Sequence, residues 1–293
     1  MTNPTHSTYR GRFAPSPSGP LHFGSLIAAL GSYLRARSKR GQWLVRMEDI
    51  DPPREQVGAA DTILHTLEAF GFEWDEKVLY QSQRVISYQA VIHQLLTHNQ
   101  AYYCQCSRKQ IKAMGGFYDG RCGQRLQTHQ QGAIRIRNPG PTIQFNDMIK
   151  GMIPIDPHFA AEDFIIKRSD GLYAYQLAVV IDDAFQQITE VVRGSDLLLP
   201  TGRQINLFQL LGKTPPHWLH LPLACEEKGK KLSKQNHATA IDIHQPQISI
   251  NQALCFLGQE TVTVETDTRL MLAQAIAQFK LDNIPTQTEI LLD

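Results

Sequence analysis

A strand, a helix and a second strand are predicted in direct succession at the start of the chain, and this order most constrains its fold. Residues 9–13 predict a short strand, which Pro15 and Pro17 end because proline cannot continue a ladder of hydrogen bonds. Apolar residues recur at helical spacing over 26–40, and 43–47 is a second strand-like run. We therefore expect a βαβ unit and a fold of the α/β class.

The rest of the chain continues this pattern with one interruption. The expected elements are helices over 59–70 and 82–96, strands over 164–167, 173–181 and 188–192, a helix capped by Ser195 or Asp196, and helices near 250–257 and 268–279. Residues 101–138 are rich in Cys, Gly, Gln and Tyr and have no sustained periodicity, so we interpret them as part of an insertion. The predicted segments are a first half of the core over 1–100, an insertion over 101–160, a second half over 161–240 and a mainly helical C-terminal part over 241–293.

Composition limits the classes of protein that this chain can represent. Hydrophobic residues make up 42% of the 293 residues and charged residues 19%, which excludes wholesale disorder. The net charge of +1 offers no overall basic excess, so any RNA contact must be local. No apolar run approaches the roughly 18 residues of a membrane span, and the first residues lack the order of a secretory signal. We expect a cytoplasmic protein without membrane contact.

The start of the first predicted helix has the features of an anion site. A loop over 12–19 with several Pro and Gly residues runs into the sequence HFGS at 22–25. Free backbone N–H groups and the positive end of the helix dipole meet at such a place, so phosphate is the expected ligand. His22 can donate a ring N–H to phosphate, and Gly24 permits close approach of a nucleotide. A purely structural helix cap is the alternative.

A lysine-rich segment far along the chain complements this site. Lys230, Lys231 and Lys234 lie in a polar stretch without apolar periodicity. Such a run is commonly only a solvated surface. A triphosphate, however, needs positive charge on both sides of its α-phosphate, and a helix N-terminus with a histidine could supply one side while the lysines supply the other.

Three of the five cysteines are close together in the sequence. Cys104, Cys106 and Cys122 fall within the predicted insertion, whereas Cys225 and Cys255 stand apart. The odd number and the spacing favour a reduced compartment over a disulfide framework. Three thiolates at this spacing can converge on one zinc ion, and free structural thiols are the alternative.

With these motifs in order along the chain, the sequence resembles the class I aminoacyl-tRNA synthetases. HFGS at 22–25 corresponds to their histidine-containing signature and KLSKQ at 231–235 to their lysine signature. The stretches over 12–22, 46–54 and 192–198 look like the glutamate-specific branch. The resemblance implies a Rossmann-like catalytic domain with a zinc-containing insertion and a short helical C-terminal part.

Within that branch, the resemblance is strongest to short members that activate glutamate and attach it to the queuosine base of the tRNA(Asp) anticodon. Few residues follow position 235, which fits the expectation that a large anticodon-binding domain is lacking. The implied partners are ATP with Mg²⁺, L-glutamate and tRNA(Asp) carrying queuosine, and we expect a monomer. The alternatives are a shortened enzyme that charges the acceptor end of tRNA(Glu), a non-catalytic zinc-stabilised RNA-binding module and a nucleotidyltransferase.

The resemblance also assigns roles to individual residues. His22 and Lys234 would be catalytic by stabilising charge at the phosphates. The implied ATP contacts are His22, Gly24, Ser25, Lys231 and Lys234. The implied glutamate contacts are Arg12, Phe13, Ala14, Pro15, Ser16, Glu48, Tyr175 and Arg193. The implied zinc ligands are Cys104, Cys106, Tyr118 and Cys122. Glu48 would pair with the α-ammonium, whereas which arginine meets which carboxylate stays open.

Overall fold

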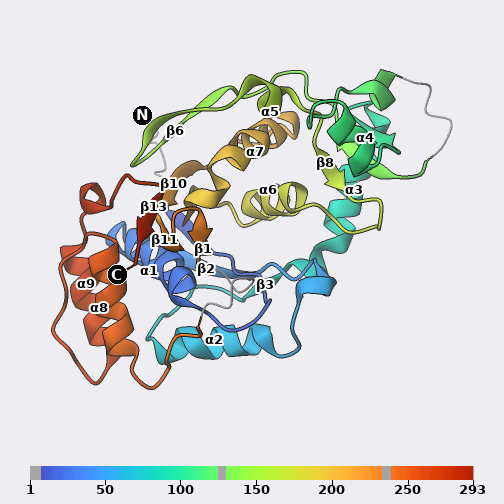
Figure 1. The fold of residues 1–293 in the computed structure, drawn as a ribbon. Helices are drawn as coiled ribbons and strands as arrows, with labels where there is room; N and C mark the ends of the chain where they lie inside the picture. Colours follow the sequence, from blue (N-terminus) through green and yellow to red (C-terminus); the bar gives the residue numbers. More distant parts are fainter. Residues whose placement is uncertain (1–7, 125–129, 233–238, 293) are drawn as a thin grey trace, which may run out of the picture.

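A parallel sheet near the N-terminus confirms the predicted opening unit. The computed structural model describes residues 8–124, 130–232 and 239–292. Strand β1 (Arg10–Phe13) pairs in parallel with β2 (Gln42–Met47), and β2 pairs in parallel with β3 (Leu79–Tyr80). Helix α1 (Phe23–Ser38) connects β1 to β2 (Figure 1). The βαβ unit therefore forms where the apolar spacing predicts it.

The second half of the core lies beside β1. Strand β10 (His217–Leu221) pairs in parallel with β9 (Glu190–Gly194) on one side and with β6 (Gln144–Asp147) on the other. The amide of Thr189 donates to the carbonyl of Arg10 over 2.9 Å and joins the start of β9 to β1. The strand order therefore reverses between β1 and β9. In open α/β sheets, ligands bind at such a reversal, beyond the carboxyl ends of the strands.

Two hydrophobic cores share the central strands. Along β2, Trp43, Val45 and Met47 belong to one core and Leu44 to the other, as the alternation of side chains in a strand requires. The helices of the first core are α1, α2 (Ala59–Ala69), α8 (Pro246–Phe256) and α9 (Thr268–Gln278). Those of the second are α3 (Val85–Thr97), α6 (Tyr175–Phe185) and α7 (Leu198–Leu210).

Residues 101–160, the predicted insertion, contribute strands to two sheets. Strands β4 (Ala101–Cys104) and β5 (Ala133–Ile136) are antiparallel, and β5 also pairs with β8 (Ile165–Lys167), which follows the predicted insertion. Strand β6, which pairs with β10 of the core, continues into β7 (Gly151–Pro154) as a hairpin. The short helices are α4 (Arg108–Ala113) and α5 (Pro157–Ala161). The part with α4 lies at the opposite end of the molecule from α8 and α9 (Figure 1).

A fourth sheet, of three strands, carries the start of the lysine-rich segment. Strand β11 (Leu223–Glu227) pairs in antiparallel fashion with β12 (Lys230–Lys231) and in parallel with β13 (Glu289–Leu291). The last strand of the chain, β13, therefore packs beside β11, which follows the second half of the core. In the described ranges, every helix is too short or too polar to cross a bilayer.

One predicted strand and one predicted helix cap are wrong. Residues 173–181 do not form a strand, because Tyr175 begins helix α6, in which the residues from Leu177 to Asp183 are buried. A short apolar run cannot distinguish a strand from a helix that is covered on most sides. Helix α7 has no side-chain cap, and the hydroxyl of Ser195 donates instead to the carbonyl of Leu221 over 2.7 Å.

Candidate active site

The first turn of α1 and the lysine-rich segment face the same cavity. This cavity has a volume of about 190 Å³. Its lining includes His22, Gly24 and Ser25 from the start of α1 and Lys231 and Leu232 from the distant segment. The two sequence motifs are therefore neighbours in space, as a shared nucleotide site requires.

Local contacts explain how the two segments meet. The ring Nδ1 of His22 accepts a hydrogen bond from the amide of Ser25 over 3.3 Å, so the histidine caps α1. A Cβ placed on Gly24 would lie 3.6 Å from the carbonyl oxygen of Leu232. The ammonium of Lys231 forms an ion pair with Asp196, which also lines the cavity. The predicted catalytic residue Lys234 lies outside the described residues.

Arg193 is a buried cation with neutral neighbours. Its Nε donates to Nε2 of His220 over 3.1 Å and its Nη1 to the hydroxyl of Tyr175 over 3.2 Å. Its Nη2 donates to the carbonyl of Leu197 over 3.2 Å and to the hydroxyl of Thr201 over 2.8 Å. Burial lowers the pKa of Arg193, because no carboxylate among the described residues pairs directly with it. This positive charge is available to a bound anion.

Arg12 has a different environment, because it already has a carboxylate partner. Its Nε and Nη2 donate to the two carboxylate oxygens of Asp183 over 2.9 and 3.3 Å. Arg46 donates to the same carboxylate over 2.7 Å. Burial alone would raise the pKa of Asp183, but the charges of Arg12 and Arg46 outweigh burial and hold that pKa below its ordinary value. Asp183 therefore stays ionised and orients both arginines.

Glu48 lies directly beyond the carboxyl end of β2, as predicted. Its carboxylate accepts a hydrogen bond from Arg46 over 3.3 Å, and its amide donates to the carbonyl of Pro15 over 3.0 Å. Burial raises the pKa of Glu48, although the charges of Arg46 and Arg12 counteract this shift. With the exposed Ser16, Glu48 lines an open cavity of about 290 Å³. A cation placed there would replace the lost hydration of the carboxylate.

The other predicted glutamate contacts occupy mixed positions. The ring of Phe13 stacks on Trp43 at 6.3 Å within the core, so only its backbone can face a ligand. Ala14 and Pro15 are half-buried in the loop after β1. Tyr175 begins α6, and burial raises the pKa of its hydroxyl. The hydroxyl therefore stays protonated at neutral pH and can donate to a ligand while accepting from Arg193.

The three clustered cysteines converge in the insertion. The Sγ atoms of Cys104, Cys106 and Cys122 all lie within 4.8 Å of one another, and those of Cys106 and Cys122 are 3.5 Å apart. Zinc–sulfur bonds of about 2.3 Å place tetrahedral ligands roughly 3.8 Å apart, so the cluster fits one zinc ion. The hydroxyl of Tyr118 accepts a hydrogen bond from the amide of Cys122 over 2.8 Å. The fourth predicted ligand therefore lies at the same cluster.

Comparison with known proteins agrees with this geometry. Residues 8–282 match the family model of the catalytic domain of class I tRNA synthetases (E and Q). Glutamyl-Q tRNA(Asp) synthetase of Shewanella oneidensis is 65% identical over 97% of this chain and 95% of its own length. The protein of the same name in Shewanella frigidimarina is 62% identical over 97% of each chain. The chain belongs to the glutamyl-Q tRNA(Asp) synthetase family.

A solved structure extends the comparison beyond this family. A glutamate tRNA ligase from Elizabethkingia meningosepticum, solved in complex with its amino acid, is 25% identical with a TM-score of 0.77. The match covers 96% of this chain and 66% of that chain. The class I catalytic fold predicted from the signatures is therefore confirmed.

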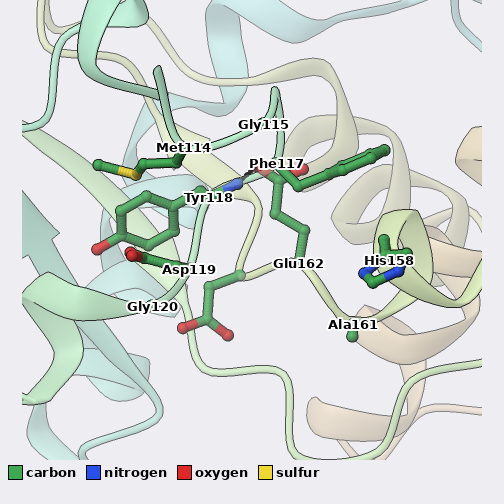
Figure 2. A pocket seen from close by; sticks show the side chains of 10 residues that line it. Met114, Gly115, Phe117, Tyr118, Asp119, Gly120, His158, Ala161 and Glu162 are labelled. Carbon is green, nitrogen blue, oxygen red and sulfur yellow. Dashed lines mark hydrogen bonds between the residues drawn. The ribbon is translucent and has the colours of Figure 1, made fainter. Parts of the chain in front are cut away.

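In this member of the glutamyl-Q tRNA(Asp) synthetase family, a third cavity is lined by residues that include Tyr118, His158 and Glu162 (Figure 2). Its volume is about 680 Å³. Phe117 stacks on His158 of α5 at 6.0 Å, and Glu162 accepts from the amide of Tyr118 over 3.2 Å. Glu162 also accepts from Arg203 of α7 over 2.7 Å. Through Glu162, the segment that contains Tyr118 is therefore connected to helix α7.

Sequence reasoning missed the residues that support the arginines. Asp183 belongs to no motif of the sequence, and its partners Arg12 and Arg46 lie 171 and 137 positions away. His220 and Asp147 belong to no motif that the sequence displays. No local spacing signals either residue, since their contacts form only when β6, β9 and β10 align.

Proposed function

We propose that the protein activates L-glutamate with ATP to form glutamyl-adenylate, and then transfers glutamate to the queuosine base at the wobble position of the tRNA(Asp) anticodon. Membership in the glutamyl-Q tRNA(Asp) synthetase family supports this reaction. The single structural observation that carries the proposal is the cavity shared by His22, Gly24 and Lys231. The shared lining supports a single nucleotide site to which both motifs contribute.

The first step needs no side chain as nucleophile. A carboxylate oxygen of the bound glutamate attacks the α-phosphorus of ATP and forms a new oxygen–phosphorus bond. The bond between the α-phosphorus and the oxygen that bridges to the β-phosphate breaks, and pyrophosphate leaves with its electron pair. Rate then depends on positioning and on charge stabilisation at the phosphates. We assign that stabilisation to His22 and Lys234, with Gly24, Ser25 and Lys231 as further ATP contacts. Mg²⁺ accompanies ATP.

The different environments of Arg193 and Arg12 indicate which of them binds a carboxylate of glutamate. Arg193 lacks a direct carboxylate partner among the described residues, so it is the better partner for a substrate carboxylate than Arg12, which Asp183 already neutralises. Tyr175 adds a hydroxyl contact, and Glu48 pairs with the α-ammonium. Arg12 and the loop 13–16 border the same site.

In the second step, a hydroxyl of the queuosine ring attacks the acyl carbon and AMP leaves.

The cysteine cluster has a structural role in this proposal. Cys104, Cys106, Cys122 and Tyr118 would hold one zinc ion and thereby stabilise a loop with a small core of its own. The cluster does not line the nucleotide cavity. A cytoplasmic location and a monomeric state stay predictions from the sequence.

Two measurements test the proposed reaction. Glutamate-dependent exchange of pyrophosphate into ATP without tRNA should be observed, and its absence would favour a non-catalytic RNA-binding module. Radiolabelled glutamate should then appear in the anticodon fragment of queuosine-containing tRNA(Asp) after nuclease digestion. The same tRNA without queuosine is the matched control. Because a glutamate tRNA ligase has a similar structure, label at the acceptor end of tRNA(Glu) would favour that activity instead.

A further inference from the structure

The orientation of the Arg193 guanidinium is fixed by its hydrogen-bond partners. The group has five N–H donors in a rigid plane. Among the described residues, the contacts to His220, Tyr175, Leu197 and Thr201 use four of these groups. One N–H of Nη1 is left for a ligand. The position of that N–H depends on the contact at Nε, since the guanidinium is planar and rigid.

His220 provides the contact at Nε of Arg193. It lies on β10 and is completely buried. Its Nε2 accepts from Arg193 over 3.1 Å, and its Nδ1 lies 2.7 Å from a carboxylate oxygen of Asp147. Burial lowers the pKa of His220 to about 4, so the ring is neutral at neutral pH.

These two partners determine where the single ring proton lies. An arginine cannot accept a hydrogen bond, so Nε2 of His220 must carry the lone pair that receives the N–H of Arg193. The proton therefore lies on Nδ1 and is donated to Asp147. A histidine held by a carboxylate at one nitrogen presents a defined acceptor at the other.

Asp147 is itself held rigidly at the end of β6. One oxygen accepts from the amides of Ile149 and Lys150 over 3.1 and 3.0 Å, and the other accepts from the amide of His220 over 3.0 Å. Packing restrains the ring as well, with Trp218 stacked at 6.4 Å. The chain of contacts thus runs from β6 through β10 to Arg193 on β9.

We propose that His220 and Asp147 are positioning residues that hold the guanidinium of Arg193 for a carboxylate of the substrate. This inference rests on the proposed function, because it takes Arg193 as a glutamate contact. Neither residue touches the substrate. Their arrangement keeps a neutral acceptor beside Arg193, so the positive charge of the arginine is not cancelled by its support.

Two substitutions of similar size separate the two contacts of His220. His220→Gln places a carbonyl oxygen at about the depth of Nε2 and can keep the contact to Arg193. His220→Asn places its amide at about the depth of Nδ1 and can keep only the contact to Asp147. We expect His220→Asn to raise the KM for glutamate in pyrophosphate exchange about 10- to 100-fold, since a hydrogen bond to a charged group is lost. His220→Gln should stay within about 3-fold of the wild type.

Asp147→Asn provides an independent test without changing the histidine. The amide of asparagine would donate toward Nδ1 and so favour the other tautomer, whose Nε2–H opposes the N–H of Arg193. We expect a similar rise in the KM for glutamate and an unchanged KM for ATP.

The double variant Asp147→Asn with His220→Asn should have a KM for glutamate no higher than that of His220→Asn alone, because both changes disturb the same contact to Arg193. His217→Asn, at an exposed position of the same strand, is the control.

The outcomes distinguish this inference from the proposed function. If the wild type shows no glutamate-dependent exchange, the proposed function fails. If the wild type is saturated by glutamate but His220→Asn and Asp147→Asn keep its KM, the positioning role is wrong. Equal rises in KM for His220→Asn and His220→Gln would also overturn it. A merely structural role would lower the melting temperature and kcat without changing KM, and if His220→Asn does not fold, Asp147→Asn decides.

Discussion

The carbonyl oxygen of Leu232 lies over Gly24, only 3.6 Å from the point where a Cβ would stand on that glycine. The same Cβ would lie 3.1 Å from the ring of His22. The first turn of α1 and the segment after β12 therefore lie close together: a Cβ on Gly24 would make an ordinary contact with Leu232 and a tight contact with His22. Glycine relieves this close approach, and its backbone conformation is one that other residues also adopt.

Gly24→Val should consequently close the nucleotide cavity. A branched side chain would push His22 and Leu232 apart, at a cost typical of overpacking. We expect the KM for ATP to rise about tenfold or more while the KM for glutamate changes little. Gly140→Val is the matched control, since a Cβ at Gly140 meets no atom within 4 Å. Equal ATP kinetics in the two variants would contradict a nucleotide site at Gly24.

Lys234→Ala should slow adenylate formation about 10²–10³-fold, because one contact to the developing charge is lost. Pre-steady-state measurement of adenylate formation would show this directly. Lys230→Ala is a suitable control, because Lys230 is exposed and pairs with Glu227. If both variants react at the wild-type rate, the lysine signature has no part in the chemistry.

Local patterns predicted the parts of this site that are continuous in the sequence. The βαβ unit, the helix start at His22 and the position of Glu48 follow from apolar spacing and from proline and glycine. Helix α6 was misread, because a short buried run has no solvent-facing side to reveal its period. The partnership of Arg12 with Asp183 was invisible, since 171 positions separate the two residues.

Asp183→Asn should strongly destabilise the fold. The carboxylate lies between Arg12 and Arg46, and all three side chains are at most 3% exposed. Its neutralisation leaves the buried guanidinium of Arg12 without its carboxylate partner and leaves Arg46 with Glu48 alone, and breaking such a buried pair costs about 3–5 kcal/mol in comparable cases. Urea unfolding at pH 7 measures this loss.

The control for that experiment is Asp170→Asn. Asp170 forms an exposed ion pair with Arg168, and such pairs contribute little to stability because water screens them. Similar unfolding midpoints for the Asp183 and Asp170 variants would show that the buried arrangement contributes little to stability.

Removal of zinc should loosen the insertion without abolishing adenylate formation. Cys122→Ser removes one thiolate of the cluster, so we expect zinc affinity to fall at least tenfold in competition with a chelator. If the phenol of Tyr118 is the fourth ligand, Tyr118→Phe should also weaken zinc binding, but by less than Cys122→Ser does. Cys255→Ser is the control, because Cys255 is exposed and lies outside the cluster. Zinc content that is equal in the Cys122 and Cys255 variants would exclude this site.

The low pKa of His220 predicts how stability depends on pH. The pKa of this histidine falls from an ordinary 6.5 to about 4 in the folded chain, because burial disfavours the charged ring. The unfolded chain therefore takes up the proton first as the pH falls, and stability declines from about pH 6.5 down to about pH 4. This difference in proton uptake lowers the free energy of unfolding by roughly 3 kcal/mol over that interval.

Glutamine cannot titrate, so the free energy of unfolding of His220→Gln should fall less steeply than that of the wild type. Urea unfolding of both proteins at pH 7, 5.5 and 4.5 measures the difference, and parallel profiles would show that His220 has the same pKa in the folded and unfolded chains.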